Sequence, residues 1–302
     1  MPSALDRVGI VGASGYVGGA LAQALVADGG SPRLFGRCAG RVAGLEVRAL
    51  TSDSSQFAGL DCVVHLSGIT TSRASSDDLR RANVELALDT ARMAAAAKVT
   101  RFVFTSSLHV HGKSSKEAIR PETPTNPAAN PYGRSKGEAE RELTKLADET
   151  GLELAILRPP MIYGSGSKGS FPLLVRLVRT GLPLPFATAR AKRSFCSIDN
   201  VVSAIRHSIA APAPVEVFLP ADPEDFDTAT LVREVAAALD RKMLLWPAPK
   251  ALLAAPLGMI GRGEMVASLF DPLQIDRTHW GRLGWQPVET GAQAIRKAVR
   301  SR

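Results

Sequence analysis

In the first half of the chain, short apolar runs alternate with longer segments whose apolar residues repeat with a helical period. The short runs are bounded by Gly and polar residues, and the longer segments are rich in Ala and Leu. This alternation is typical of βαβ units, which build a parallel sheet covered by helices. The pattern predicts strands at 8–11, 33–35, 45–50, 62–66 and 101–105, and helices at 16–27 and 77–97.

The middle of the chain continues this alternation of strands and helices, and its residue composition then changes. Asn130 is a suitable N-cap and Pro131 a suitable first residue for a helix that ends before Gly151. A strand is expected next, at 154–157, because this run is apolar and short. Between 164 and 193 the chain is rich in Gly, Pro and basic residues, which predicts the start of a second lobe.

Together these elements predict an α/β fold, a Rossmann-like doubly wound parallel sheet with a smaller C-terminal substrate lobe. A helix at 198–210 and a strand at 215–219 are expected to return to the sheet. The expected division is a dinucleotide-binding domain at 1–163, to which 194–220 returns, and a substrate lobe made of 164–193 and 221–302.

Composition excludes several classes of protein. The 302 residues are 45% hydrophobic and 22% charged, which is ordinary for a globular protein and unlike a disordered or fibrous chain. The net charge of +8 directs attention to anionic partners: nucleic acid, phosphorylated metabolites or a membrane surface. With only 5% aromatic residues the chain offers no stacking platform, so no nucleic-acid partner is expected.

The cysteines and the hydropathy indicate the cellular compartment in which the protein is expected. Cys38, Cys62 and Cys196 are widely spaced and have no histidine at ligand spacing, so neither disulfides nor a metal site is expected. The late apolar segment 251–260 is ten residues long and contains Pro256, too short to insert into a membrane. These features predict a cytoplasmic protein.

A glycine-rich turn follows the first predicted strand. Gly12, Gly15 and Gly18 have the spacing of a dinucleotide fingerprint, with the glycines allowing close approach to a pyrophosphate at the start of a helix. The alternative is an ordinary Gly-rich turn between a strand and a helix. The predicted cofactor contacts in this turn are Gly12, Ser14, Gly15, Tyr16, Val17 and Gly18.

The end of the second predicted strand bears on the choice of dinucleotide. An acidic residue at this point would hold the ribose hydroxyls of NAD, but 29–45 contain no acid and three arginines, Arg33, Arg37 and Arg41. Arg37 follows the strand directly and suits the extra phosphate of NADP. NADP is therefore expected, with NAD as the alternative; the arginines could also be solvated loop charges.

A second constellation combines hydroxyl groups with a lysine. Tyr132 and Lys136 are four residues apart and share one face of the predicted helix, where the cation would lower the pKa of the phenol. The strand at 101–105 runs into Ser106 and Ser107 at the edge of the sheet where ligands bind. These residues suit proton transfer to or from a carbonyl or hydroxyl group, although the serines could simply end the strand.

These motifs together resemble the extended short-chain dehydrogenase/reductases, which include nucleotide-sugar epimerases and dehydratases. The resemblance rests on 12–18, 63–68, the Thr-Ser-Ser run ending at Gly112, 132–136 and 157–164, and it covers nearly the whole chain. It implies that Ser107, Tyr132 and Lys136 are the catalytic triad, with Tyr132 and Lys136 also contacting the cofactor. It further implies cofactor contacts by Leu66, Ser67, Gly68, Asn83, Pro159 and Ile162.

The later segments resemble a bacterial subgroup that modifies UDP-linked sugars. There the resemblance implies that Arg193, and also Arg262, binds the substrate diphosphate, with Lys168, Ser170 and Ser107 as further substrate contacts. Three positions depart from the family pattern: Ala49 replaces an acid, His111 a tyrosine and Ser170 an asparagine. These departures bear on adenine binding and on the identity of the sugar.

The leading functional expectation is an NAD(P)-dependent reductase of a 4-keto-6-deoxy UDP-sugar. One alternative is a UDP-sugar C4-epimerase that keeps NAD bound; another is reduction of a non-sugar carbonyl. A third, of a different class, is a non-catalytic protein that senses a dinucleotide; the complete Ser107, Tyr132 and Lys136 set argues against it. The expected partner is a nucleotide sugar, and the expected assembly is a homodimer.

Overall fold

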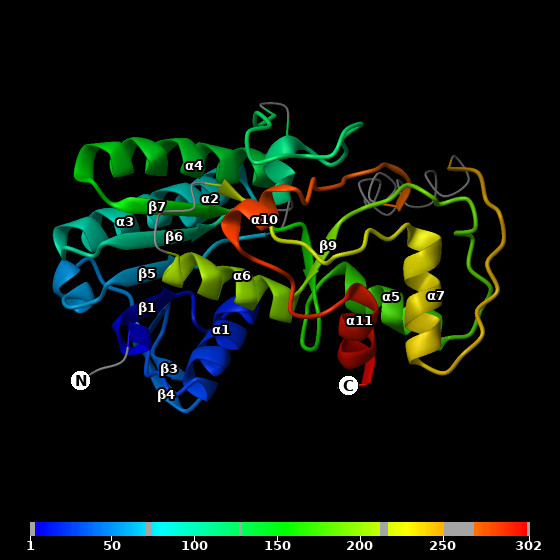
Figure 1. Cartoon of the computed structure of the whole chain (residues 1–302), viewed down its shortest axis with the longest axis horizontal. Helices are drawn as coiled ribbons and strands as arrows, with labels where there is room; N and C mark the ends of the chain where they lie inside the picture. Colours follow the sequence, from blue (N-terminus) through cyan, green and yellow to red (C-terminus); the bar gives the residue numbers. More distant parts are fainter. Residues whose placement is uncertain (1–3, 71–73, 127–128, 212–216, 251–268, 301–302) are drawn as a thin grey trace. The chain divides into compact units, whose positions relative to one another are not determined.

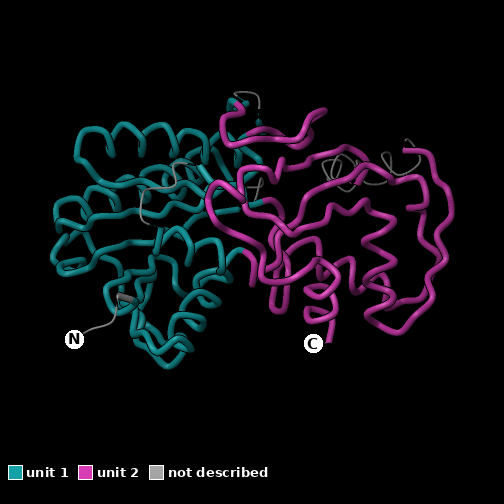
Figure 2. The backbone as a smooth tube through the Cα atoms, in the orientation of Figure 1, with its two compact units in different colours: residues 1–110, 124–159, 201–219 teal, residues 111–123, 160–200, 220–302 magenta. Residues whose placement is uncertain are grey.

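The computed structural model describes residues 4–70, 74–126, 129–211, 217–250 and 269–300. Clustering of contacts divides the chain into two compact units (Figure 2). Unit 1 comprises 1–110, 124–159 and 201–219, and unit 2 comprises 111–123, 160–200 and 220–302. The predicted division into a cofactor domain and a substrate lobe stays a prediction, because compactness says nothing about which ligand each unit binds.

Unit 1 is built on an eight-stranded sheet with the order β10-β7-β6-β5-β1-β2-β4-β3. Every pairing is parallel except that of β3 with β4. The order reverses direction on either side of β1, which creates the switch point where open α/β sheets bind their ligands. The strands are β1 (Val8–Val11), β2 (Arg33–Gly36), β3 (Gly40–Val42), β4 (Leu45–Ala49), β5 (Cys62–His65), β6 (Arg101–Thr105), β7 (Glu153–Leu157) and β10 (Val217–Phe218).

Helices cover both faces of this sheet (Figure 1). On one face lie α3 (Leu86–Ala96) and α4 (Pro131–Thr150), and on the other α1 (Tyr16–Ala27) and α6 (Ile198–Ala210). The central strands are buried on both faces, as their continuous apolar runs predicted. The predicted doubly wound parallel sheet is therefore confirmed. The short elements η1 (Ala4–Arg7) and η2 (Ser54–Phe57) complete the unit before α3.

The predicted helix at 77–97 is broken into three pieces. The structure has α2 (Ser76–Arg80), a π-helical turn η3 (Arg81–Glu85) and then α3. The π turn places Asn83 so that its side chain reaches the backbone of Ile69 and the hydroxyl of Ser135. Tertiary hydrogen bonds therefore stabilise a local departure that the sequence periodicity did not indicate.

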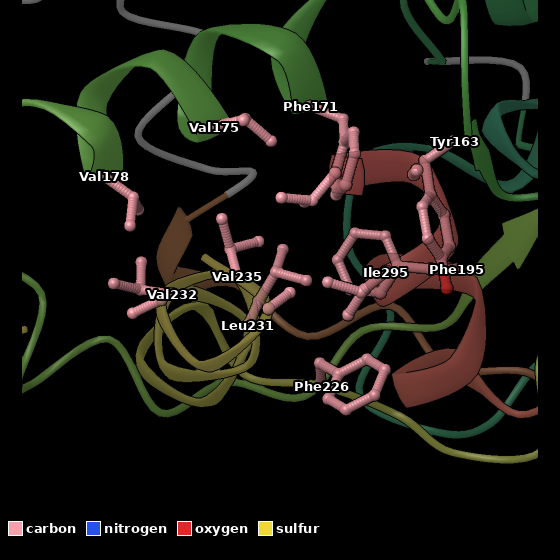
Figure 3. Packing of buried hydrophobic residues seen from close by; sticks show 14 of the residues in the cluster. Tyr163, Phe171, Val175, Val178, Phe195, Phe226, Leu231, Val232, Val235 and Ile295 are labelled. Carbon is pink, nitrogen blue, oxygen red and sulfur yellow. The ribbon is translucent and has the colours of Figure 1, made fainter. Parts of the chain in front are cut away.

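Unit 2 has a separate hydrophobic core (Figure 3). Tyr163, Phe195, Phe226, Val235 and Ile295 are among its buried members. Most members of this core come from a small parallel sheet and from three helices: β8 (Met161–Tyr163), β9 (Phe195–Ser197), α5 (Ser170–Arg179), α7 (Thr228–Ala238) and α11 (Gly291–Arg300). The two-stranded β8-β9 sheet and the β3-β4 hairpin were not predicted.

Two short helices complete the unit, η4 (Leu108–His111), which begins in unit 1, and α10 (His279–Leu283). In the described ranges, no helix is both long and apolar enough to cross a membrane.

Candidate active site

The glycine-rich turn between β1 and α1 forms a tight cradle. Gly12 has a φ of +90°, and a Cβ atom at Gly18 would lie 2.2 Å from the carbonyl oxygen of Gly12. A side chain at either position would therefore open the turn. Gly15 caps α1 without a side-chain hydrogen bond, and Ser14 is exposed beside it. Uncapped N–H groups at a helix start bind phosphate, so this turn fits the pyrophosphate of a dinucleotide.

Tyr16 and Val17, the first residues of α1, are partly buried in the same turn. The buried hydroxyl group of Tyr16 lies away from solvent. Their assignment to the cofactor stays a prediction.

Only one of the three arginines near β2 is left for a ligand. Arg33 donates to the carbonyl oxygens of Gln56 and Ala58, and Arg41 donates to that of Gly44. Arg37 is exposed directly after β2, and in the described ranges it makes no hydrogen bond or ion pair. Of the three, Arg37 therefore has the freedom that binding of a phosphate requires.

The loop after β5 adjoins Lys136. Leu66 and Ser67 are partly buried, and Gly68 is exposed. A Cβ atom at Gly68 would lie 2.6 Å from Oδ1 of Asn83 and 3.5 Å from Nζ of Lys136. The loop edge and the helix that carries Lys136 therefore meet at Gly68.

Asn83 ties this loop to α4. It is fully buried; its amide group donates to Ile69 O (3.0 Å) and Ser135 Oγ (2.9 Å), while its Oδ1 accepts from Ile69 N (2.8 Å). Both amide protons are thus used within the protein, which differs from the cofactor contact expected of Asn83. The geometry therefore gives Asn83 a positioning role. It holds the loop after β5 against the helix that carries Tyr132 and Lys136.

The structure brings Ser107 and Tyr132 together. Ser107 follows β6, and its Oγ accepts from the His109 amide (3.2 Å) and is hydrogen-bonded to the Tyr132 hydroxyl. Tyr132 lies in the first turn of α4, which begins at the N-cap Asn130, whose Oδ1 accepts from Gly133 N (2.7 Å). A Cβ atom at Gly133 would lie only 2.2 Å from the carbonyl oxygen of His109. Glycine at 133 thus allows the two catalytic segments to touch.

Lys136 lies one turn further along α4 and is buried. Its Nζ donates to the carbonyl oxygen of Thr105 (2.8 Å) and lies 4.5 Å from the centre of the Phe104 ring. Burial lowers the pKa of Lys136 to about 8, while the charge of Glu140 acts in the opposite direction. The ammonium group is therefore held at the sheet edge by β6.

One electrostatic expectation was wrong. The sequence predicted that Lys136 would lower the pKa of Tyr132, but burial raises it, and the hydrogen bond from Ser107 acts against this increase. The reason is geometric: the charge of Lys136 is directed to Thr105 O instead of to the phenol.

A buried ion pair that sequence reasoning missed supports these residues. Arg158 donates through Nε (3.0 Å) and Nη2 (2.7 Å) to the carboxylate of Glu140, which also accepts from the Ser106 hydroxyl. Ser106 precedes Ser107, Glu140 lies one turn after Lys136, and Arg158 precedes Pro159. One carboxylate therefore joins β6, α4 and the end of β7. The i,i+4 spacing of Lys136 and Glu140 was the available signal.

The other predicted residues have varied environments. Pro159 is buried after β7, Ile162 is partly buried in β8, and His111 is buried at the end of η4. Ala49 is exposed at the end of β4. Lys168 and Ser170 are exposed before and at the start of α5, within unit 2. Arg262 lies outside the described residues.

The Arg193 side chain is buried within unit 2. It is 8% exposed, and its Nη1 donates to the carbonyl oxygens of Lys113 (3.1 Å) and Asp271 (2.6 Å). Burial lowers its pKa to about 10. These carbonyl contacts orient the guanidinium group and use one of its terminal nitrogens. The assignment of Arg193 to a diphosphate stays a prediction.

This arrangement is suited to proton transfer. A phenol is hydrogen-bonded to a serine hydroxyl at the carboxyl edge of a parallel sheet, next to a buried lysine. A phosphate-binding turn opens at the same edge, because β1 and β6 both neighbour β5. The residues therefore fit a dinucleotide, and the geometry agrees with the family that the motifs resemble.

Comparisons with known proteins test that agreement. The model of the NAD dependent epimerase/dehydratase family matches residues 8–218. A UDP-glucose 4-epimerase of Vibrio cholerae is 36% identical over 226 residues, which cover 74% of this chain and 69% of that protein. An N-acetyl-alpha-D-glucosaminyl-diphospho-ditrans,octacis-undecaprenol 4-epimerase of Escherichia coli O157:H7 is 28% identical over 266 residues, covering 85% and 78%.

The fold itself is also found among solved structures. The UDP-N-acetylglucosamine 4-epimerase from Bacillus cereus superposes with a TM-score of 0.79 and covers 97% of this chain and 98% of its own, at 16% sequence identity. At that identity the likeness shows the fold alone. The family model and the Vibrio cholerae relative decide the classification: the chain is an enzyme of the NAD dependent epimerase/dehydratase family.

Proposed function

We propose that this enzyme is a UDP-sugar 4-epimerase, which inverts the hydroxyl group at C4 of a hexose linked to UDP. The supporting observation is the 36% identity to a UDP-glucose 4-epimerase over 74% of the chain. This proposal replaces the leading expectation from the sequence, reduction of a 4-keto-6-deoxy sugar. Both reactions use the same Ser107, Tyr132 and Lys136, so the triad by itself does not separate them.

In the proposed mechanism Tyr132 acts as the phenolate: it accepts the proton of the C4 hydroxyl group, becomes the neutral phenol, and later returns the proton to the same oxygen. Ser107 donates a hydrogen bond to that oxygen and, with Tyr132, fixes its position. Lys136, with a pKa of about 8, is cationic at neutral pH, and its ammonium group is held at Thr105 O beside these two hydroxyl groups. When bound, the nicotinamide supplies reversible exchange of a hydride with C4.

The residues proposed to hold the cofactor are those at the switch point of the sheet. The turn from Gly12 to Gly18 binds the pyrophosphate, and the loop at 66–68 lies along the neighbouring strand end. Arg37 is proposed to contact a 2′-phosphate, so the cofactor is NADP. The family's description names NAD, which makes Arg37 the residue on which this choice rests.

A change at Arg37 tests the cofactor. Replacement by alanine should weaken binding of NADP by about tenfold or more while leaving NAD binding nearly unchanged, because one charge-assisted phosphate contact is lost. Arg41→Ala is the matched control, since Arg41 donates to Gly44 O within the hairpin. Equal binding of NAD and NADP by the unaltered enzyme would show that Arg37 has no part in the choice.

The reaction is tested with purified enzyme, UDP-glucose or UDP-N-acetylglucosamine, and no added cofactor. Chromatography should show conversion to the C4 epimer, and Tyr132→Phe should lower kcat by about a hundredfold or more. Tyr163→Phe is the control, because Tyr163 lies in the core of unit 2. Oxidation of NADPH by a 4-keto-6-deoxy UDP-sugar without any epimerisation would support the reductase instead.

A second candidate substrate is a sugar linked through a diphosphate to a polyprenol. It is supported by the Escherichia coli relative, whose match extends over 85% of this chain. Both substrates present a sugar diphosphate, so the same triad serves either. A parallel assay with the polyprenyl-diphosphate sugar in detergent distinguishes them by the ratio of kcat/KM values.

A further inference from the structure

Unit 2 exposes several large apolar side chains that come from two segments. They are Leu173 (42% exposed), Leu177 (37%), Leu182 (62%), Leu244 (67%) and Trp246 (40%), here called the Trp246 face. Single exposed apolar residues are common on proteins, but five within two short segments are not. All five lie in α5, in the stretch after α5 or in the stretch after α7.

The two segments are paired in the structure. Leu184 N donates to Leu244 O and Trp246 N to Leu184 O, both at 3.0 Å, around a parallel bridge between Leu184 and Leu245. Leu184 and Leu245 belong to the core of unit 2. Because side chains alternate along an extended chain, Leu244 and Trp246 project away from that core.

The helix α5 also has one apolar face toward the core of unit 2 and a second apolar face away from it. Phe171, Val175 and Val178 face the core, whereas Leu173 and Leu177, four residues apart, lie on the opposite face. Nη1 of Arg241 donates to the carbonyl oxygen of Arg179 (2.8 Å), which joins the end of α5 to the start of the second segment. In Figure 1 the stretches after α5 and after α7 run side by side, in agreement with these bonds.

These segments also hold the chain's positive charge. Residues 164–198 and 241–250 contain nine Lys and Arg and no Asp or Glu, whereas the whole chain has a net charge of +8. The rest of the chain therefore has a net charge near zero.

Three of the nine are used within the protein: Arg190 pairs with Asp227, Lys250 pairs with Asp271, and Arg193 is buried. The other six are exposed and form no ion pair with the described residues: Lys168, Arg176, Arg179, Lys192, Arg241 and Lys242.

We propose that the Trp246 face docks on a lipid surface that carries anionic headgroups. Leucine and tryptophan side chains next to arginine and lysine are the composition of surfaces that lie in a membrane interface. The cations would bind the headgroups and the apolar side chains would enter the boundary of the acyl chains. A second copy of the chain is a poorer partner, because two such faces would bring like charges together.

This proposal is independent of the proposed 4-epimerase activity. It concerns where the enzyme binds, and its test contains no substrate. If the enzyme also accepts the polyprenyl-linked sugar, docking would place unit 2 against the surface in which that substrate is anchored.

The test measures binding of the full chain to vesicles of phosphatidylcholine alone or mixed with phosphatidylglycerol. We expect co-sedimentation with the mixed vesicles only, and release at high salt. Trp280 and Trp285 are buried, at 8% and 3% exposed. A blue shift of tryptophan emission on binding should therefore come from Trp246 and be lost in Trp246→Phe.

Two variants separate the contributions of charge and apolar contact. Arg176→Gln with Arg179→Gln, and Leu244→Ser with Trp246→Ser, should each weaken vesicle binding by about tenfold or more. The control combines Arg92→Gln with Val288→Ser, an exposed arginine and an exposed valine outside the face. It should bind as the unaltered chain does, and unchanged melting temperatures would show that all three remain folded.

Three results would overturn the proposal. One is failure of the unaltered chain to bind mixed vesicles; another is equal binding of the control and the two face variants. The third is concentration-dependent self-association that Leu244→Ser with Trp246→Ser abolishes, which would assign the face to contact between copies. Loss of 4-epimerase activity in the assay above would leave the vesicle result unaffected.

Discussion

Each unit holds one buried carboxylate at the centre of a polar network, and the two are stabilised differently. In unit 1, Glu140 is 4% exposed and accepts from both Arg158 and the Ser106 hydroxyl. In unit 2, Asp222 is fully buried, and among the described residues its carboxylate accepts from neutral donors alone. These donors are the Tyr163 hydroxyl (2.6 Å), the Ser197 amide (2.8 Å) and the Asn200 side chain (2.7 Å).

The neutral donors around Asp222 affect how its carboxylate responds to pH. Burial raises the pKa of Asp222 to about 6, although its three hydrogen bonds act to lower it. No cation lies among the donors that reach it, whereas Glu140 is paired with a guanidinium in bidentate geometry. Unit 1 therefore pairs its buried carboxylate with a cation, whereas the unpaired carboxylate of unit 2 titrates within the mildly acidic range.

The largest effect is expected from Glu140→Ala. Removing the carboxylate leaves the guanidinium of Arg158 in a buried site without its counter-charge, which costs about 3 to 5 kcal/mol of unfolding free energy. Urea unfolding at pH 7 measures this loss. The pKa of Lys136 should also fall below about 8, because the charge of Glu140 supports the ammonium form. The alkaline limb of the activity profile should shift to lower pH accordingly.

A double variant separates stability from positioning. Glu140→Ala with Arg158→Met removes both charges, so most of the unfolding free energy should return while the shifted pH profile remains. If Glu140→Ala alone were as stable as the unaltered chain, Glu140 and Arg158 would not form the pair described here. Restoration of the original pH profile in the double variant would remove the link to Lys136.

The next largest effect concerns Asp222→Asn. The folded pKa of about 6 is above the ordinary value of 3.8, so this group's contribution to stability is full below about pH 4 and is lost as the pH rises through 6. The difference between the two limits is about 3 kcal/mol. In the variant this component is absent, so unfolding free energy should depend less steeply on pH between about 4 and 7.

Asp89→Asn is the matched control, since Asp89 is 63% exposed and pairs with Arg92 on the surface. Its pH dependence should follow that of the unaltered chain. Identical slopes for Asp222→Asn and Asp89→Asn would mean that Asp222 does not titrate as the network indicates.

The variant Lys136→Met tests whether the buried charge of Lys136 lowers the stability of unit 1. The folded pKa of about 8 lies below the ordinary value of 10.5, so the charged form is disfavoured by burial and this cost is present at neutral pH. After subtracting the lost bond to Thr105 O, the variant should gain about 2 kcal/mol and melt a few degrees higher, but without activity. Lys145→Met, on an exposed part of the same helix, should leave both almost unchanged. A lower melting temperature for Lys136→Met contradicts the assignment.

The smallest effect is expected from Tyr163→Phe. The variant loses one hydrogen bond to Asp222, which costs about 1 kcal/mol, and the core packing of the ring is kept. Since that bond lowers the pKa of Asp222, its removal should raise this pKa further. The pH at which stability declines should thus move upward. No shift in that midpoint would indicate that Asp222 relies on Ser197 and Asn200 alone.

Much of unit 1 was predictable because its signals are local. The apolar runs, the Asn130-Pro131 helix start and the Gly12 to Gly18 turn each depend on neighbours within a few residues. The π-helical turn at Asn83 and the pairing of β8 with β9 depend on contacts between residues far apart in the sequence. Such contacts produce no periodic pattern of apolar residues. The burial of Arg193 likewise depends on distant residues, because its Nη1 donates to Lys113 O and Asp271 O.

The sequence by itself determined the fold class, and it predicted the glycine-rich turn and the candidate residues Ser107, Tyr132 and Lys136, since these belong to short motifs. Only the tertiary structure decided how the ionisable groups are neutralised. Glu140 meets Arg158 across 18 residues and Asp222 meets Tyr163 across 59, and Lys136 turns to Thr105 instead of to Tyr132. Charge interactions depend on distance and burial, and only folding sets both.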